Sequence, residues 1–252
     1  MTARTRTRVF LAAMAGLAAF YVWGLTGLPG FGSYPGPYGY ILDHVAVLQT
    51  NATGVVSAIN FSYRGIDTLG EEFILFIAAT GVSTVLRHLR GEREESAGAA
   101  ALRAEGPAPS DATRQATVLF VGPVMVMGWF LGSHAQTSPS GGFQGGVILA
   151  TAFILIYLAG QFLAFRRLSP VPLTDAVGAV GAGGFAVIGL AAVAQGLPYL
   201  YNFLPLGSVP GAVSSSGTIA LISFFVGVEV AAAFVLIVSE LLEQTLLVEA
   251  ER

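Results

Sequence analysis

A short charged segment, SYRGIDTLGEEFI, carries the first side chains of this sequence that could handle ions. Arg64 and Asp67 are spaced for an ion pair, and Glu71 and Glu72 follow just before an apolar run. Thr68 and Glu71 have the spacing of a helix capping box, and carboxylates suit the positive end of a helix dipole. A cap does not account for Glu72, which points about 100° away from Glu71 on a helix. Two interpretations stay open: a capped, solvated helix entrance, or an acidic vestibule that gathers cations or passes protons inward.

Glu229 is the second candidate, because it lies near the middle of the apolar run LISFFVGVEVAAAFVLIVSEL. An ionisable group at the centre of a bilayer costs about 2.5–3.5 kcal/mol even on mild insertion scales. The carboxyl group is therefore expected to face protein or water instead of lipid. It could be a neutral group that hydrogen-bonds a neighbouring helix, or a station in a proton or cation path, and we favour the path.

A glycine-rich segment, HAQTSPSGGFQGGVILA, is the third candidate. Gly141 with Gly145, and Gly142 with Gly146, form two overlapping small-xxx-small pairs, which predict a tight turn and then a helix packed closely against another. His134 beside them is a candidate for a proton path, although a lone histidine here is more typical of an interfacial residue. No Lys and no G-K-[ST] follow, so a phosphate loop is excluded. Ser140 near His134 could form a nucleophile–base pair, but it lies in a predicted turn and nothing supplies an oriented third member, so we expect a chain that is not an enzyme.

The composition places these residues in a membrane protein. Of the 252 residues, 54% are hydrophobic and only 11% are charged, whereas soluble domains are about a quarter charged. The formal net charge of −3 argues for no nucleic-acid partner. The absence of Cys, with only three widely spaced His, predicts no metal site, and nothing indicates a cofactor.

Six stretches are long and apolar enough to cross a bilayer, which takes about 20 residues. They are residues 9–28, 69–89, 115–132, 145–165, 174–195 and 217–240. The first resembles a signal peptide, but large aromatic residues stand where small cleavage residues are needed, so we expect an uncleaved first span. The stretch ILDHVAVLQTNATGVVSAINF is only weakly amphipathic and is not expected to span. The predicted fold is an all-α integral membrane protein with six transmembrane helices, multi-pass in the cell membrane.

The arginines predict the orientation of the chain. With a cytoplasmic N-terminus, those that flank the spans fall on one side: Arg4, Arg6, Arg8, Arg87, Arg90, Arg93, Arg114, Arg166 and Arg167. Both termini are then cytoplasmic, and Arg64 is the only outer arginine. Asp175 is expected to cap the start of the fifth span. Glu240 and Glu243 are expected in headgroups or water at the cytoplasmic end of the sixth.

Residues 91–112 break the hydrophobic pattern with Glu, Ala, Gly and Pro, which predicts a cytoplasmic linker. The linker separates a two-helix module, residues 1–90, from a four-helix module, residues 113–252.

These motifs carry a family resemblance. HAQTSPSGGFQGGVILA with GVEVAAAF downstream resembles the B subunit (MnhB) of the Mrp multisubunit sodium/proton antiporters and the equivalent subunit of energy-converting hydrogenases. The usual glycine triplet after the Pro is here Ser140-Gly141-Gly142. INFSYRGIDTLGEEFILFIAATGV is similar to the carboxy-terminal part of the large A subunit, a separate small subunit in the hydrogenases, with R-x-x-D-T-L-G-E intact.

The resemblance implies a membrane subunit of an Mrp-type complex in the lipid bilayer, with other membrane subunits as partners and Na⁺ and H⁺ as transported ions. Glu71, Glu72 and Glu229 would be hydrated stations, and Arg64 with Asp67 would hold the entrance. The alternatives are a non-conducting scaffold, or a subunit of a related hydrogenase or a redox- or carbon-uptake-linked ion pump.

Overall fold

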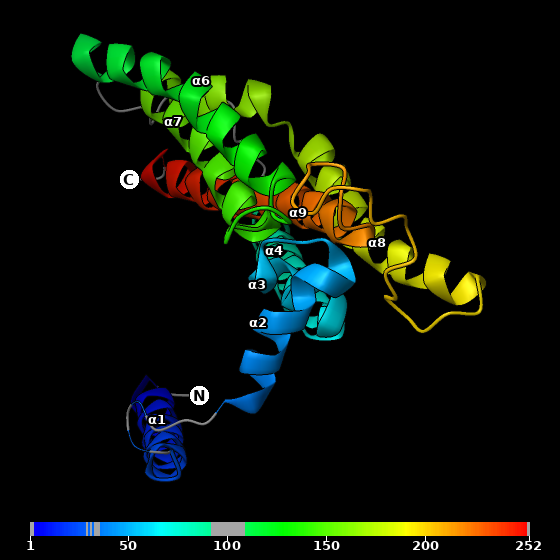
Figure 1. Ribbon diagram of the computed structural model, residues 1–252. Helices are drawn as coiled ribbons and strands as arrows, with labels where there is room; N and C mark the ends of the chain where they lie inside the picture. Colours follow the sequence, from blue (N-terminus) through cyan, green and yellow to red (C-terminus); the bar gives the residue numbers. More distant parts are fainter. Residues whose placement is uncertain (1–2, 29, 31, 33–35, 92–108, 251–252) are drawn as a thin grey trace. The chain divides into compact units, whose positions relative to one another are not determined.

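The computed structural model describes residues 3–28, 30, 32, 36–91 and 109–250. Over these residues the chain is helical (Figure 1). The elements are α1 (Ala3–Thr26), α2 (Pro37–Thr50), α3 (Val55–Ala58), the π-helix η1 (Ile59–Tyr63), α4 (Gly65–Gly91), α6 (Asp111–Ser133), α7 (Gly142–Leu168), α8 (Val171–Ala194) and α9 (Thr218–Ala250). The predicted linker falls mainly on residues 92–108, outside the described residues.

The six predicted spans are confirmed as six helices long and apolar enough to cross a membrane. They are α1, α4, α6, α7, α8 and α9. The weakly amphipathic stretch forms the short elements α2, α3 and η1, none of which has a spanning length. The chain divides after Ile41 into two units, and everything described below lies in the second unit.

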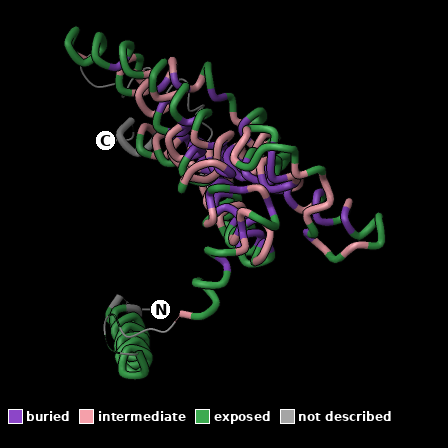
Figure 2. The backbone as a smooth tube through the Cα atoms, in the orientation of Figure 1, coloured by how far each residue is buried: buried purple, intermediate pink, exposed green. Residues whose placement is uncertain are grey.

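Helix α9 is the centre of the second unit. It packs against α7, α8 and α4, while α6 lies mainly against α7 (Figure 1). The apolar window of α9 is 56% buried, whereas that of α6 is 11% buried, so α6 leaves most of its surface open. Buried segments gather where these helices meet (Figure 2). The polar side chains in the middle of α9 are therefore enclosed by neighbouring helices.

Glycines of α7 allow the close packing on both sides of this helix. A Cβ on Gly146 would lie 2.6 Å from the Gly227 carbonyl oxygen of α9, and one on Gly142 would collide with the Ser223 carbonyl oxygen. A Cβ on Gly145 would lie 2.7 Å from the Gly128 carbonyl oxygen of α6. Gly141 differs, because it is the extended residue at the start of α7, and its nearest neighbour is Gln144.

The start of α4 differs from the prediction. The chain runs through α3 and η1 and re-enters an α-helix at Gly65, with Arg64 between them at φ −129° and ψ 34°. Thr68 is therefore already inside the helix and is buried, so the predicted capping box of Thr68 and Glu71 is wrong. A cap cannot explain why carboxylates gather here.

Candidate functional site

The outer charged cluster separates into an exposed ion pair and a buried carboxyl group. Arg64 donates to Asp67, and these side chains are 59% and 45% exposed. Glu71 is also exposed. Glu72, one position further along α4, is only 4% exposed, and its Oε2 has no hydrogen-bond partner. Glu72 is thus the member of the cluster that the fold places inside the protein.

Glu71 and Glu72 line a cavity of about 270 Å³. We call it the outer cavity because the predicted topology places this end of α4 on the outer side. The other polar lining groups come from α3, η1, α4, the turn before α7 and the first turn of α7: Ser57, Asn60, Thr68, Ser140 and Gln144. A close backbone contact holds the two segments together, since the Gly54 amide donates to the Gln136 carbonyl at 2.9 Å. The cavity therefore has the oxygen-rich lining that suits water or a hard cation.

Glu229 occupies the centre of the helix packing. Its side chain is 0% exposed, and neither carboxyl oxygen has a hydrogen-bond partner. It lies 11 residues after Thr218, which is about 16 Å along α9 at 1.5 Å per residue. Helix α8 approaches it closely, since a Cβ on Gly181 would lie 2.6 Å from the Glu229 nitrogen. Such a group is costly to bury unless a proton, a cation or water satisfies it.

Glu72 and Glu229 are close enough for their charges to act on each other. Two carboxylates that share a low-dielectric site repel, and the repulsion falls when a proton or cation lies between them. Glu72 faces the outer cavity, and Glu229 also lines a second, inner cavity. The pair therefore places one buried carboxyl group at each cavity.

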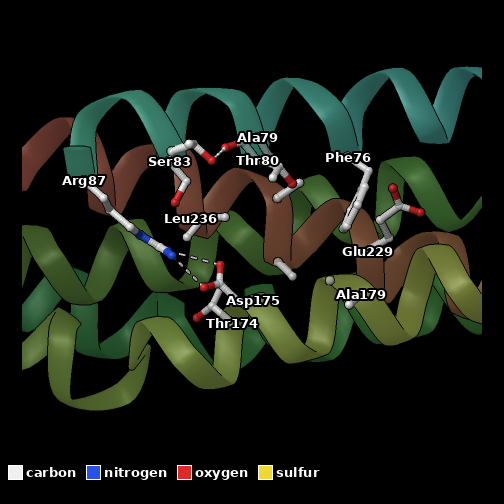
Figure 3. Close-up of a pocket in the computed structure, with 14 residues that line it drawn as sticks. Phe76, Ala79, Thr80, Ser83, Arg87, Thr174, Asp175, Ala179, Glu229 and Leu236 are labelled. Carbon is white, nitrogen blue, oxygen red and sulfur yellow. Dashed lines mark hydrogen bonds and ion pairs between the residues drawn. The ribbon is translucent and has the colours of Figure 1, made fainter. Parts of the chain in front are cut away.

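The inner cavity, about 280 Å³, lies between α4, α8 and α9. Glu229 and Phe76 stand at one end, and Arg87 and Asp175 stand at the other (Figure 3). Hydroxyl groups line the space between these ends: Thr80, Ser83, Thr84 and Thr174. These hydroxyl groups and the carboxyl groups at the two ends are possible ligands for water or a cation, in a cavity whose lining is otherwise mainly apolar.

Arg87 joins three helices at the far end of the inner cavity. Its Nε donates to Glu240 Oε1 at 2.7 Å, and its terminal nitrogens donate to the two Asp175 oxygens at 2.9 and 3.2 Å. Ser83 also donates to Glu240, at 3.1 Å. We call Arg87, Asp175, Glu240 and Ser83 the arginine junction. It holds two carboxylates against one guanidinium, so it carries an excess negative charge when both are ionised.

The arginine junction corrects two predictions. Helix α8 begins at Val171, after Pro170, so Asp175 lies beyond the cap position and pairs with Arg87 instead. Glu240 is 0% exposed and Glu243 is 7% exposed, so neither carboxyl group lies in water or headgroups. The expectation failed because α9 continues past residue 240 with arginines of other helices beside it.

From the sequence, Arg87 served only to predict the orientation of the chain, and its pairing with Asp175 and Glu240 was not predicted. A signal was available, because Glu72, Phe76, Ser83 and Arg87 recur at helical spacing on α4 and so share one face. On α9, Glu229, Leu236, Glu240 and Glu243 recur in the same way. Two polar stripes with matching spacing predict two facing helices.

His134 lies apart from the carboxylates. It ends α6, its ring stacks on Phe130 with centroids 4.2 Å apart, and its Nδ1 lies 2.9 Å from the Phe130 carbonyl oxygen. It lines neither the outer nor the inner cavity. The structure therefore brings Glu72 close to Glu71 and Glu229. The exposed pair of Arg64 and Asp67 lines neither cavity, and His134 lies apart from the carboxylates.

Fold and site together define a polytopic helical membrane protein with carboxyl groups enclosed between its spans. Residues 112–236 match the family model described as a domain related to the MnhB subunit of Na⁺/H⁺ antiporters. The chain belongs to this family and is a membrane subunit of the Mrp type.

Two relatives extend the comparison. The chain is 31% identical over 199 residues to the uncharacterized protein MJ1307 of Methanocaldococcus jannaschii, covering 70% of this chain and 72% of that one. It is 30% identical over 137 residues to the probable K⁺/H⁺ antiporter A/B subunit of Rhizobium meliloti, covering 48% of this chain and 14% of that one.

Two solved structures resemble the whole chain. One is a chain of the membrane-bound sulfane sulfur reductase, an archaeal respiratory membrane complex, with a TM-score of 0.71 and 27% identity over 94% of this chain and 98% of that one. The other is a chain of the Mrp complex from Dietzia sp. DQ12-45-1b, with a TM-score of 0.66 and 22% identity over 96% of this chain and 26% of that one. The second shows the shared fold alone.

Proposed function

We propose that this subunit moves protons or sodium ions through the membrane as part of an Mrp-type antiporter complex with other membrane subunits. The observation that carries the proposal is Glu229, whose two carboxyl oxygens are buried without hydrogen-bond partners at the inner cavity. A purely structural glutamate would be expected to hydrogen-bond a neighbour, because an unsatisfied buried polar group is destabilising.

The proposed path begins at the outer cavity, where Glu71 and Glu72 gather the cation or proton. Repulsion between Glu72 and Glu229 favours passing positive charge from one to the other. The inner cavity then leads to the arginine junction. Arg87 lies 15 residues after Glu72, which is about 22 Å along α4 and most of a hydrocarbon core of about 30 Å. One face of α4 therefore extends along most of the crossing.

Arg64 and Asp67 form the rim of the outer cavity in this proposal. Their mutual ion pair leaves Glu71 and Glu72 as the negative charges that attract cations. In the proposed mechanism the chain works in transport and not as an enzyme, and its ions come from water and from partner subunits in the lipid bilayer. His134 has no part in the path.

We also propose that the chain unites two modules, residues 1–90 and 113–252. The family model begins at residue 112, so α4 lies outside it. Glu72 and Arg87 then belong to the front module, and Glu229 and Glu240 belong to the back module.

A second function is favoured by the sulfane sulfur reductase comparison, because that match covers nearly the full length of both chains. In this alternative the chain serves the ion-pumping membrane part of a respiratory complex. The proteins that co-purify with a tagged copy in mild detergent distinguish the two: large antiporter subunits support the first, and redox subunits support the second.

Glu229→Gln tests the path itself, in a strain that depends on the complex. Inverted vesicles are assayed for the proton gradient that added Na⁺ or K⁺ dissipates. We expect at least a tenfold loss of rate, because the amide cannot bind a proton or neutralise a cation. Glu72→Gln is expected to lower the rate at the same step.

Asp111→Asn is the matched control, since Asp111 is an exposed carboxylate at the start of α6 that lines neither cavity. It should leave the rate unchanged. Complex yield is measured for every variant. Full transport by Glu229→Gln in an intact complex would show that Glu229 serves only in helix packing. A lower yield of the complex with unchanged turnover would indicate a scaffold subunit.

A further inference from the structure

A groove on the surface between α6 and α7 lies outside the proposed ion path. Its volume is about 560 Å³, the largest of the four cavities described for this chain. Aliphatic side chains line most of it, among them Val118, Val121 and Ile156. One end is different, because the guanidinium of Arg114 lines it near the start of α6. The groove is thus apolar along its length and cationic at one end.

Local sequence explains why the two helices leave space here. Gly122, Ala159 and Gly160 line the groove with almost no side chain. Just beyond them α7 is interrupted at Gln161, which has φ 60° and ψ −169° inside an otherwise helical segment. Because these small residues stand next to the interruption of α7, they leave a gap that longer side chains would have filled.

Arg114 is available for a ligand. Its side chain is exposed, and no hydrogen bond or ion pair joins that side chain to any residue that the structure describes. Asp111, three positions earlier, is the nearest acidic residue in sequence and does not pair with it. By contrast Arg64, Arg87 and Arg166 all have carboxylate partners. Among the described residues, Arg114 is therefore a cation without a carboxylate partner at the end of an apolar groove.

We propose that this groove binds one anionic phospholipid, whose phosphate is held by Arg114 and whose acyl chain lies along α6 and α7. A guanidinium matches phosphate oxygens in charge and geometry. From Arg114 to Gly122 the groove follows α6 for eight residues, about 12 Å, which is a distance that the upper part of an acyl chain can cover. The Arg114 end lies on the predicted cytoplasmic side, together with exposed Arg167.

The choice of a lipid over a protein partner follows from the charge pattern. A neighbouring helix that covered this groove would have to supply a carboxylate at the depth of Arg114, whereas an anionic lipid brings phosphate and hydrocarbon in that order. The proposal does not depend on the ion path, because Arg114 lines neither of its cavities.

The test uses the purified full-length chain in neutral detergent, with thermal unfolding followed as phosphatidylglycerol or phosphatidylcholine is added. Phosphatidylglycerol is expected to raise Tm saturably, and phosphatidylcholine and inorganic phosphate are not. Arg114→Gln should weaken the apparent affinity about fivefold, the usual contribution of one arginine near an anionic lipid. Ala159→Phe fills the groove without changing charge and should weaken it as well.

Arg8→Gln removes an exposed arginine of α1 and should change nothing, which controls for general attraction to anionic lipid. An equal response of Arg114→Gln and the original chain would overturn the proposal, as would equal stabilisation by phosphatidylcholine. Because the chain has no Cys, a single Val121→Cys in the assembled complex gives a clean crosslinking probe. Crosslinking to a neighbouring protein instead of to a reactive lipid would show that protein covers the groove.

Discussion

Replacing Arg87 by Met should destabilise the protein far more than its partial exposure suggests. Arg87 is 38% exposed, but Glu240 beneath it is 0% exposed and Asp175 is 39% exposed. Removing the guanidinium takes away the cation to which the buried Glu240 carboxylate is hydrogen-bonded. A buried ion whose partner is removed costs about 3–5 kcal/mol. Water reaching the exposed half of the site lowers this cost, so we expect a loss of about 3 kcal/mol.

A double-mutant cycle separates the pair from its surroundings. At 2.7 Å the attraction is about 6 kcal/mol for an effective dielectric constant of 20, and desolvation of both ions cancels a large part of it. Glu240→Gln alone leaves Arg87 bound to Asp175 and should cost about 1 kcal/mol. The double variant should then be more stable than the sum of the single changes predicts, by about 2 kcal/mol.

The measurement is equilibrium unfolding of the purified chain in mixed micelles of mild and denaturing detergent, followed by circular dichroism. The exposed pair of Arg64 and Asp67 is the matched comparison and should show a coupling of about 0.2–1 kcal/mol. If the effects of Arg87→Met and Glu240→Gln add within about 0.5 kcal/mol, the arginine junction is a surface feature and the reasoning from burial fails.

Three further predictions concern packing, capping and pH, each measured in the same unfolding assay. Gly146→Ala should cost about 1–3 kcal/mol by overpacking against α9, whereas Gly183→Ala, with nothing within 4 Å of its added Cβ, should be neutral or stabilising by up to about 1 kcal/mol. Ser110→Ala removes the oxygen that accepts from the Thr113 amide and should cost about 1 kcal/mol. Burial raises the pKa of Tyr199, so the stability it contributes is present below about pH 10 and lost as the pH rises further. Tyr199→Phe should therefore keep more of its stability in that alkaline range.

The six helices followed from the sequence because the bilayer sets a single length for any spanning apolar helix. Glu229 was also found this way, since a carboxylate inside such a run is unusual wherever the helix packs. The same method placed Glu240 wrongly. A carboxylate at the end of an apolar segment is expected to contact water only when no other helix supplies a cation. Glu240 is paired with Arg87, which lies 153 positions earlier in the sequence.

Local rules failed where the backbone departs from a regular helix. Thr68 and Glu71 have a capping spacing, but η1 brings the chain into α4 four residues earlier, at Gly65 instead of Leu69. Residue spacing records which groups share a turn and not where the turn begins. The break of α7 at Gln161 left no signal either, because Gly160 beside it is one of 32 glycines, many of them inside helices.

The candidate path lies between the two proposed modules, and this suggests a reason for joining them in one chain. Glu72 and Arg87 lie on α4, and their partners Glu229, Asp175 and Glu240 lie on α8 and α9. Neither set encloses a cavity alone: the inner cavity needs walls from α4, α8 and α9. If α4 dissociated, Glu229 and Glu240 would face lipid without a cation beside them, at a cost of several kcal/mol each, of the order of 2.5–3.5 even on mild scales. Covalent linkage keeps α4 at a high effective concentration and so limits this exposure. In the proposed two-module organisation, the linkage would protect the same carboxylates that the proposed path requires.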